Sequence, residues 1–471
     1  MTDSYDILIR GGRVVDPTNG LDEIVDVALA GGEVVAVGPD LSGTADETVD
    51  AAGALVLPGL VDLHVHIASH VAPGAAHKML ARAGVTTALD LSGPAASVVE
   101  EGARSGTGLQ IAVVEQVKPD VHMPRNPSRA QIRAAFDKIL AAGGIGVKLH
   151  VDKGWDADDT GAIIDEANRH GVWVASHCGT TSAGSDIEGL RQTLELAGDN
   201  HIQIAHVNSY CRGDIETADA EAHVAVDLLR ASPHVFAESY LAEINGTSGA
   251  CADGLPSNKR VRGWLERGGY DGTEDGLRRA IRDGFASVPR LTEDDMILEV
   301  GETGVGLWEA AGTKTGICLP INPGISRLML GASRNAEGRF DVHAFATDGG
   351  GIPRNVTLEM GLSMIDWGLL GIADLVHKAC RVPALVLGLP AKGHLGVGAD
   401  ADLIVVDPAT RRPSTVVAGG KVVLHEGKVL GSGTRFVHAG LGTDHVNRMA
   451  GPGTVIDPVA TGLYTGEGIV A

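Results

Sequence analysis

The chain has 471 residues, 60 acidic and 38 basic side chains, a net charge of −22 and 44% hydrophobic residues. This length allows one large domain or two to three ordinary ones. The recurring apolar segments exclude a disordered chain. Nucleic acid is not an expected partner, because a strongly acidic surface repels phosphate. The sequence shows neither a signal-peptide core nor the roughly 18 apolar residues of a membrane span, so we expect a cytoplasmic protein without a membrane partner.

The N-terminal segment alternates apolar and polar residues with a period of two, in YDILIRGGRVVD and EVVAVGPDL. A matching pattern returns near the C-terminus, in ADLIVVDP and STVVAGGKVVLHEGKVL. Each end is too short to bury a sheet face alone, so the two ends are expected to pair. The pattern predicts one small composite β-sandwich domain from residues 1–56 and 395–433.

Between these ends, short β-branched runs alternate with helical segments such as 128–143 and 159–171. Such runs are typical of parallel strands covered on both faces. Eight strand–helix units over residues 57–394 predict an α/β fold, a (β/α)₈ TIM barrel. The expected strands are LVDLHVH, TTALDLS, LQIAVVEQV, IGVKLHV, VWVASHC, IQIAHVN, HVFAES and FDVHAFATD.

The longest expected insertion, at about 241–339, separates the last two strands and would overhang the barrel mouth. We predict helices in it at 273–285 and 293–312. Residues 434–471 are rich in glycine and threonine and show little periodicity, which predicts an extended arm or tail. We expect a homo-oligomer, and the pattern leaves a role of this arm in subunit contacts open.

Asp62, His64 and His66 occur at a spacing of two in PGLVDLHVH, so on a strand they share one face. An isolated HxH is weak support for a metal site, because histidines at a strand end also bond to neighbouring carbonyls. Two further histidines, His177 and His206, lie at or near the ends of later strands.

Asp348 ends the last expected strand, ahead of a Gly-Gly-Gly turn. Active sites of barrels form at this rim, so four imidazoles and one carboxylate would meet there. A buried structural histidine explains any one of these residues but does not easily explain all of them.

Lys148 lies inside the apolar strand GIGVKLHVD, where an ammonium must be desolvated or paired. An amine that has lost its proton can add carbon dioxide, and the resulting carbamate has two oxygens that can bridge two metals. The alternative is a lysine that pairs with Asp152 or extends to the rim.

These motifs carry a resemblance that extends over nearly the whole chain. PGLVDLHVH, AGVTT, GVKLH, SHCG, AHVN, TDGGG and GHLGVGADADLIVVD resemble the amidohydrolase superfamily. The resemblance implies its binuclear branch with a carbamylated lysine, which includes dihydroorotases, hydantoinases and urease. The stretch around Lys148 also resembles urease, but a urease-like CHH flap motif is missing between the last two strands. Dihydroorotase proper is disfavoured too, because IASH follows the HxH where that family usually places an arginine.

Carried over residue by residue, the resemblance makes His64, His66 and Asp348 ligands of the more buried metal. Lys148, as N6-carboxylysine, would bridge to a second metal held by His177 and His206. These residue types fit zinc, with nickel, manganese or iron as alternatives. Two such cations roughly 3.5 to 4 Å apart would activate a bridging hydroxide, and Asp348 would shuttle the proton to the leaving nitrogen.

Residues that could contact the substrate carry weaker support. Arg354 follows the glycine-rich turn after Asp348 and Arg327 lies in the insertion, and either guanidinium could bind a substrate carboxylate. Both arginines could instead pair with surface carboxylates. His150 shares a strand face with Lys148, and His70 follows the HxH, so either could contact substrate or support a ligand.

For the remaining candidates, a structural role in packing or at a strand end is as good an explanation as a functional role. Glu238 is either a rim carboxylate or a capped strand end. The five cysteines form no CxxC pair, and Cys178 and Cys211 are expected to be buried thiols.

The leading hypothesis is metal-dependent hydrolysis of a small-molecule amide that is not a peptide, namely a cyclic amide, an imide or an N-acyl amide. A mononuclear deaminase of the same superfamily is the first alternative, although such deaminases lack the lysine of the fourth strand. A non-catalytic scaffold is the second alternative. It predicts that metal-ligand residues have been replaced, whereas all six expected ligand positions are intact.

Overall fold

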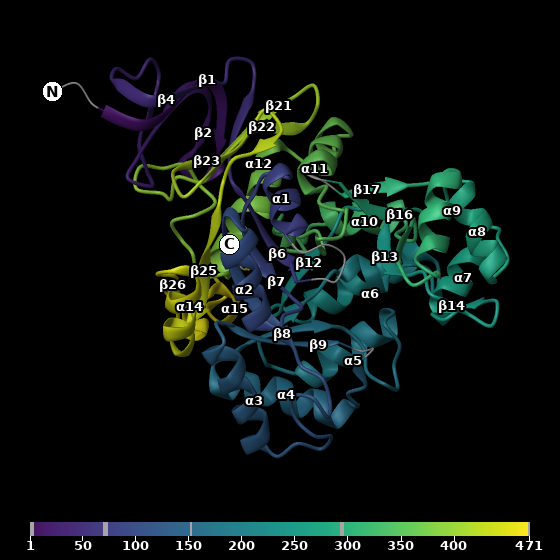
Figure 1. The fold of residues 1–471 in the computed structure, drawn as a ribbon. Coiled ribbons are helices and arrows are strands. Elements are labelled where there is room, and N and C mark those ends of the chain that lie inside the picture. Colours follow the sequence, from purple (N-terminus) through teal and green to yellow (C-terminus); the bar gives the residue numbers. More distant parts are fainter. Residues whose placement is uncertain (1–3, 69–73, 151–152, 293–295, 470–471) are drawn as a thin grey trace.

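The computed structural model describes residues 4–68, 74–150, 153–292 and 296–469. Figure 1 shows a central barrel, a separate sheet formed from both ends of the chain, and an insertion that extends to one side of the barrel. The TIM barrel with an additional β domain, predicted from the sequence, is therefore confirmed.

Eight parallel strands form the barrel, and the eighth is split into two short pieces, β19 and β20. β19 pairs with β12, while β20 pairs with β6, so residues 344–350 close the barrel. The strands are β6 (Leu60–His66), β7 (Val85–Asp90), β8 (Thr107–Gln116), β9 (Gly146–His150), β10 (Trp173–His177), β11 (Gln203–Ile204), β12 (Phe236–Ser239), β19 (Ala344–Phe345) and β20 (Gly349–Gly350).

Helices cover the outside of the barrel, as the apolar spacing at 128–143 and 159–171 predicts. Ser128 and Gln131 form a capping box that begins α3, and left-handed Gly171 ends α4. The covering helices are α1 (Ala75–Arg82), α2 (Ala95–Ser105), α3 (Arg129–Ala141), α4 (Ala157–His170), α5 (Ile187–Ala197), α6 (Ala218–Arg230), α10 (Gly324–Ala332), α11 (Thr357–Asp366), α12 (Ile372–Val376) and α13 (Val382–Val386).

The two ends of the chain meet in one nine-stranded sheet. β5 pairs in parallel with β1 and antiparallel with β21, so it joins the N-terminal strands to the C-terminal ones. The strands of this sheet are β1 (Ser4–Asp16), β2 (Leu21–Ala30), β3 (Glu33–Gly38), β4 (Thr44–Asp50), β5 (Leu55–Pro58), β21 (Leu403–Asp407), β22 (Arg412–Ala418), β23 (Lys421–His425) and β24 (Lys428–Val429).

The insertion has an apolar core of its own, which includes Trp264 and Trp308. Its elements are β13 (Asn245–Ser248), β14 (Cys251–Ala252), β15 (Leu255–Pro256), α7 (Lys259–Arg267), α8 (Glu274–Arg282), β16 (Val288–Leu291), β17 (Met296–Glu299), α9 (Gly301–Ala310) and β18 (Gly316–Leu319). The helix predicted at 293–312 is wrong at residues 296–299, because β17 pairs there with β16 and the helix begins only at Gly301; residues 293–295 lie outside the described residues.

The C-terminal residues pack against the barrel. They form β25 (Gly433–Ala439), α14 (Thr443–Ala450), β26 (Thr454–Ile456) and α15 (Gly462–Thr465). β25 pairs in parallel with β8, and its Phe436 and Val437 are buried in two apolar clusters of the barrel. Figure 1 shows these yellow elements beside α2 and β8.

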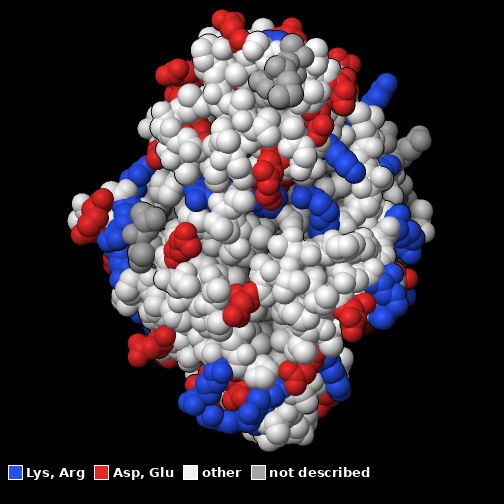
Figure 2. Space-filling model, turned by 90° about the vertical axis from the view of Figure 1, so that its left-hand side faces the viewer, with Lys and Arg blue, Asp and Glu red and all other residues white. Residues whose placement is uncertain are grey.

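Charged side chains of both signs are interspersed on the face of the molecule that Figure 2 shows, with uncharged surface between them. Among the helices of the described residues, none combines the length and the apolar character needed to cross a membrane.

Candidate metal centre

The strand ends at one rim of the barrel open into a cavity of about 460 Å³. Elements of the insertion form part of its wall, because Asn245 and Trp264 line it as well. Seven residues singled out from the sequence line this cavity: His66, Lys148, His150, His177, His206, Asp348 and Arg354.

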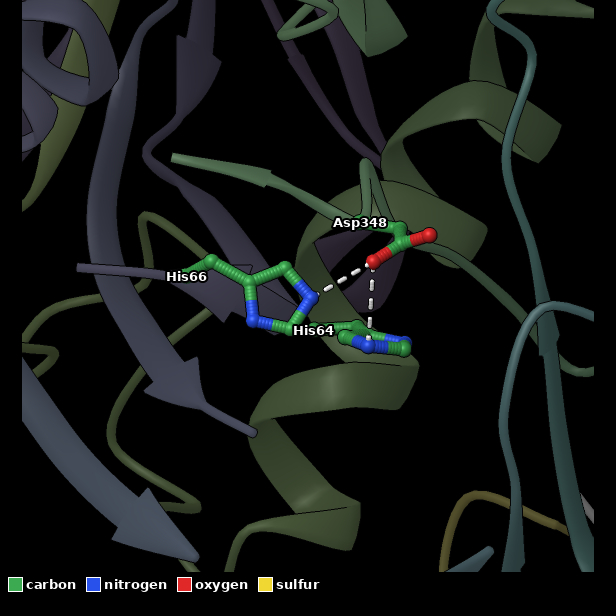
Figure 3. Close-up of side chains that lie close together, drawn as sticks. All are labelled: His64, His66 and Asp348. Carbon is green, nitrogen blue, oxygen red and sulfur yellow. Dashed lines mark hydrogen bonds and ion pairs between the residues drawn. The ribbon is translucent and has the colours of Figure 1, made fainter. Parts of the chain in front are cut away.

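His64 and His66 of β6 point toward Asp348, which lies just before β20 (Figure 3). Asp348 Oδ1 lies 2.7 Å from His66 Nε2 and 3.3 Å from His64 Nε2. One donor atom of each residue lies within 4.8 Å of the other two, which is close enough for a single cation. His64 and His66 thus lie together on β6, and Asp348 meets them from the segment that closes the barrel.

Lys148 reaches the same cluster from β9. Its Nζ lies 3.1 Å from His64 Nε2, and only 2% of the residue is exposed. Burial lowers the pKa of the Lys148 amine, which favours the neutral form that can react with carbon dioxide. Asp152, the alternative partner considered from the sequence, lies outside the described residues.

His206 lies next to His64, and His177 lies next to His206. The ring centroid of His206 lies 5.0 Å from that of His64 and 4.5 Å from that of His177. His206 Nδ1 is buried and has no hydrogen-bond partner among the described residues, as expected of an atom kept for a ligand. His177 Nε2 contacts Ser185 Oγ at 2.6 Å.

The backbone at His206 and Asp348 is unusual. His206 has φ 38° and Asp348 has φ 49°, so both lie in the left-handed region that non-glycine residues rarely adopt. Strain of this kind persists where the surrounding structure holds a residue for function. The expected strand through His206 ends early, since β11 covers only Gln203–Ile204.

Two buried carboxylates hold β6 in place behind the cluster. Glu238 Oε1 lies 2.7 Å from His64 Nδ1, which directs Nε2 of the same ring toward Asp348 and Lys148. Asp62 accepts hydrogen bonds from Thr347 Oγ1 at 2.6 Å and from the His64 N–H at 3.1 Å. The HxH pattern did not reveal these contacts, because both partners come from distant parts of the sequence.

Burial sets the ionisation of the cluster. It lowers the pKa of His64 and His177 well below the usual value, and that of His206 to about 3, so these imidazoles are neutral and can donate a lone pair. Burial alone would raise the pKa of Asp348, but the Arg354 guanidinium and the hydrogen bond with His66 oppose it, and the pKa lies well below its usual range. Neutral imidazoles and an ionised carboxylate are a donor set that fits divalent metal ions.

The three residues predicted to contact substrate differ in their positions relative to the cavity. Arg354 lines the cavity, but its Nη2 pairs with Asp348 Oδ2 at 2.5 Å and its Nη1 donates to Asn245. Arg327 donates to the backbone carbonyls of Asn322 and Leu241 and is not among the described residues that line the cavity. His150 stacks on His177, with 4.0 Å between the ring centroids.

Several residues near the cavity had no sequence pattern that singled them out. Arg212, Tyr240 and Asn322 form a buried hydrogen-bonded group beside His206. The two cysteines considered from the sequence are buried as expected, and burial raises the pKa of Cys178 to about 12, which makes it a poor nucleophile. His70 lies outside the described residues.

A parallel barrel whose rim gathers histidines, a lysine and a carboxylate defines the class of metal-dependent barrel hydrolases. Comparison with known proteins agrees with this class. Residues 55–227 match the sequence model of the amidohydrolase family. The chain is 24% identical over 429 residues to a dihydroorotase of Streptococcus pyogenes serotype M3, with 85% of this chain and 89% of that protein covered.

Two solved structures resemble the fold. N-acyl-D-glutamate deacylase from Bordetella bronchiseptica, complexed with zinc, gives a TM-score of 0.65 at 16% identity, with 92% of this chain and 99% of that one covered. A D-aminoacylase described with a binuclear metal center gives 0.64 at 17% identity, with 91% and 99% covered. Residues 55–227 therefore carry an amidohydrolase family domain, in agreement with the resemblance of the sequence motifs.

Proposed function

We propose that the protein is a metal-dependent amidohydrolase that cleaves a non-peptide C–N bond in a small molecule, either a cyclic amide or imide or an N-acyl amide. The observation that carries the proposal is the convergence of His64, His66 and Asp348, with donor atoms within 4.8 Å of one another. The dihydroorotase and deacylase relatives, which act on carbon–nitrogen bonds, support this reaction class.

The residues divide into two groups that would hold two divalent ions. His64, His66 and Asp348 would hold one ion, and His177 with His206 would hold the other. Lys148, carrying a carbamate formed with carbon dioxide, would supply oxygens to both. Zinc fits these ligands, and nickel, manganese or iron would fit as well.

The bound ions would lower the pKa of a water molecule and polarise the scissile carbonyl. Asp348 would take the proton from the attacking water and deliver it to the leaving nitrogen. Its low pKa provides the ionised form that this role requires. Arg354, which pairs with Asp348 Oδ2, would hold the carboxylate in the orientation needed to face both the ion and the water.

The test is reconstitution of the purified protein with metal and bicarbonate, followed by elemental analysis and a substrate screen. The screen would include hydantoins, dihydropyrimidines, imides, lactams, N-acyl amino acids and β-aspartyl dipeptides. We expect two metal ions per chain and hydrolysis in one of these classes. A fully active protein with one tightly bound ion would contradict the binuclear centre and favour the deaminase alternative.

Asp348→Asn provides the matched variant for this test. We expect it to keep at least one ion and to lower turnover by roughly two orders of magnitude or more, since a proton shuttle contributes about that much. Turnover close to that of the wild type would overturn the role of Asp348. A homo-oligomeric state and a cytoplasmic location stay predictions.

A further inference from the structure

Arg212 is a buried guanidinium in the wall of the metal cavity. It follows His206 along the chain, after the short 3₁₀ turn η3 (Val207–Tyr210), and only 8% of the residue is exposed. It lines the same cavity as Lys148 and Asp348. Its charge is therefore held close to the reacting groups.

The hydrogen bonds of Arg212 are all to neutral groups. Its Nε donates to Asn322 Oδ1 at 2.9 Å, and its Nη2 donates to Ser209 Oγ at 3.1 Å and to Tyr240 Oη at 2.9 Å. These three partners are themselves buried. They fix the plane of the guanidinium but do not neutralise it.

No described carboxylate oxygen lies within the 4.0 Å of Arg212 that defines an ion pair. Of the other buried arginines at this end of the barrel, Arg354 pairs with Asp348, while Arg327 donates to two backbone carbonyls and does not line the cavity. Burying a cation is costly unless an opposite charge accompanies it. The cavity wall at Arg212 therefore has a positive charge that the described protein does not balance.

We propose that Arg212 forms an anion subsite that binds the carboxylate of the substrate. This inference rests on the proposed function, and it narrows the substrate to an amide that carries a free carboxylate, such as an N-acyl amino acid or a carboxylated cyclic amide. A guanidinium held in one plane matches a planar carboxylate through two parallel hydrogen bonds. The described residues bond only Nε and Nη2 of Arg212, so Nη1 remains for the ligand.

Tyr240 connects this subsite to the metal cluster. Its hydroxyl accepts from Arg212, while the guanidinium carbon of Arg354 lies 5.1 Å from the centre of its ring. Arg354 in turn pairs with Asp348. The substrate carboxylate would thus lie on one side of Tyr240 and the scissile amide on the other. The sequence favoured Arg354 for binding the substrate carboxylate, but its guanidinium already pairs with Asp348.

The test compares binding of matched probes to the metal-loaded protein by calorimetry. The probes are N-acetyl derivatives of glycine, alanine and glutamate, in both enantiomers where these exist, each as the free acid and as the C-terminal amide. The variants are Arg212→Met, which removes the charge, and Arg212→Lys, which keeps it without the planar fork. Arg191→Met, at a partly exposed arginine on α5 that pairs with Glu188, is the control.

We expect at least one acid to bind the wild type tenfold or more tightly than its amide. Arg212→Met should abolish that preference, Arg212→Lys should keep part of it, and Arg191→Met should leave it unchanged. Metal content should stay at the wild-type value in all variants. The inference is overturned if no acid binds better than its amide, or if Arg212→Met keeps the preference.

The two proposals fail in different ways. A protein that binds two ions and hydrolyses amides without any preference for acids would retain the proposed function and lose the subsite. A metal-loaded protein that hydrolyses none of the amides, yet prefers acids through Arg212, would lose the proposed function and retain the subsite.

Discussion

Lys148 lies where a charged amine is least stable, on an apolar strand and with 2% of its surface exposed. Its contact with His64 Nε2 offers a neutral imidazole and no counter-charge. Conversion to an anionic carbamate between two cations would remove this cost, which is the physical reason to expect the modification.

We predict that Lys148→Ala loses one of two metal ions and most of its activity, because the bridging oxygens are lost. Short carboxylic acids such as acetate and propionate should restore part of the activity by occupying the space that the side chain leaves. Metal content and turnover measured with and without these acids would check this. Lys138→Ala, at an exposed lysine on α3, is the control. A binuclear, fully active Lys148→Ala protein would contradict the carbamate.

Glu238 acts through His64, since its Oε1 lies 2.7 Å from His64 Nδ1 and both residues are fully buried. Partners of this kind orient a ligand ring, and their loss typically weakens metal binding about 10–100-fold. We therefore predict that Glu238→Ala raises the metal dissociation constant by about that factor. Glu238→Gln, which keeps an oxygen that can accept from Nδ1, should retain most of the affinity in a competition titration with a chelator. Equal losses in both variants would indicate a role for the charge itself.

At the residue scale, the sequence could predict the candidate ligands but not the residues that support them. His64 and His66 are recognisable because strand geometry relates residues two apart. The contacts of Glu238 with His64 and of Asp62 with Thr347 join positions far apart in the chain, so only the folded barrel brings them together. The left-handed backbone of His206 is likewise set by tertiary structure.

At the element scale, the eight barrel strands were predictable because each forms a short apolar run between helices. The segment at 296–299 shows where this reasoning fails. Met296–Glu299 pairs with β16 inside the insertion, and this pairing overrides a local pattern that also fits a helix.

Helix α1 contains a buried histidine with an unusual environment. His77 is fully buried, and neither of its ring nitrogens has a hydrogen-bond partner among the described residues. Burial lowers the pKa of His77 to about 4, so the folded state binds its proton less readily than the unfolded state does. The stability that depends on the neutral ring is therefore present above about pH 6.5 and is lost as the pH falls through about 4.

We predict that His77→Leu raises the free energy of unfolding by about 1–3 kcal/mol at neutral pH, because an unsatisfied buried polar group is removed. The gain should grow by up to about 3 kcal/mol as the pH falls from 6.5 to 4, since the leucine cannot take up a proton. Denaturant unfolding across this range would measure both effects. His223→Leu, at an exposed histidine on α6, should change little. A pH-independent difference would show that the ring does not titrate as described.

At the scale of the whole molecule, the charge of −22 disfavours binding of any anion at a distance. An anionic substrate would be attracted only where cations are concentrated locally, and the cavity wall at Arg212 provides such a place. The composition therefore constrains where an anion can bind, although it does not reveal which arginine is left without a carboxylate.

Segments near both ends of the chain pair with strands that are distant in the sequence. The sequence predicts the pairing of the N- and C-terminal strands because both ends show the same alternation, and β5 with β21 provides it. The integration of residues after 433 was not predictable in the same way. Their glycine-rich composition hides the short strand β25, whose stability comes from its pairing with β8.

This arrangement leads to a prediction about Phe436 on β25. The residue is 1% exposed and packs in the same apolar cluster as residues of β7 and β8, so Phe436→Ala would leave a cavity between the C-terminal segment and the barrel. Substitutions of this kind cost about 3–5 kcal/mol, and we expect a loss of this size in the free energy of unfolding measured with urea. Leu441→Ala, at a leucine 60% exposed just after β25, should change it by less than about 0.5 kcal/mol. Equal effects of the two substitutions would mean that the C-terminal segment does not contribute to the stability of the barrel.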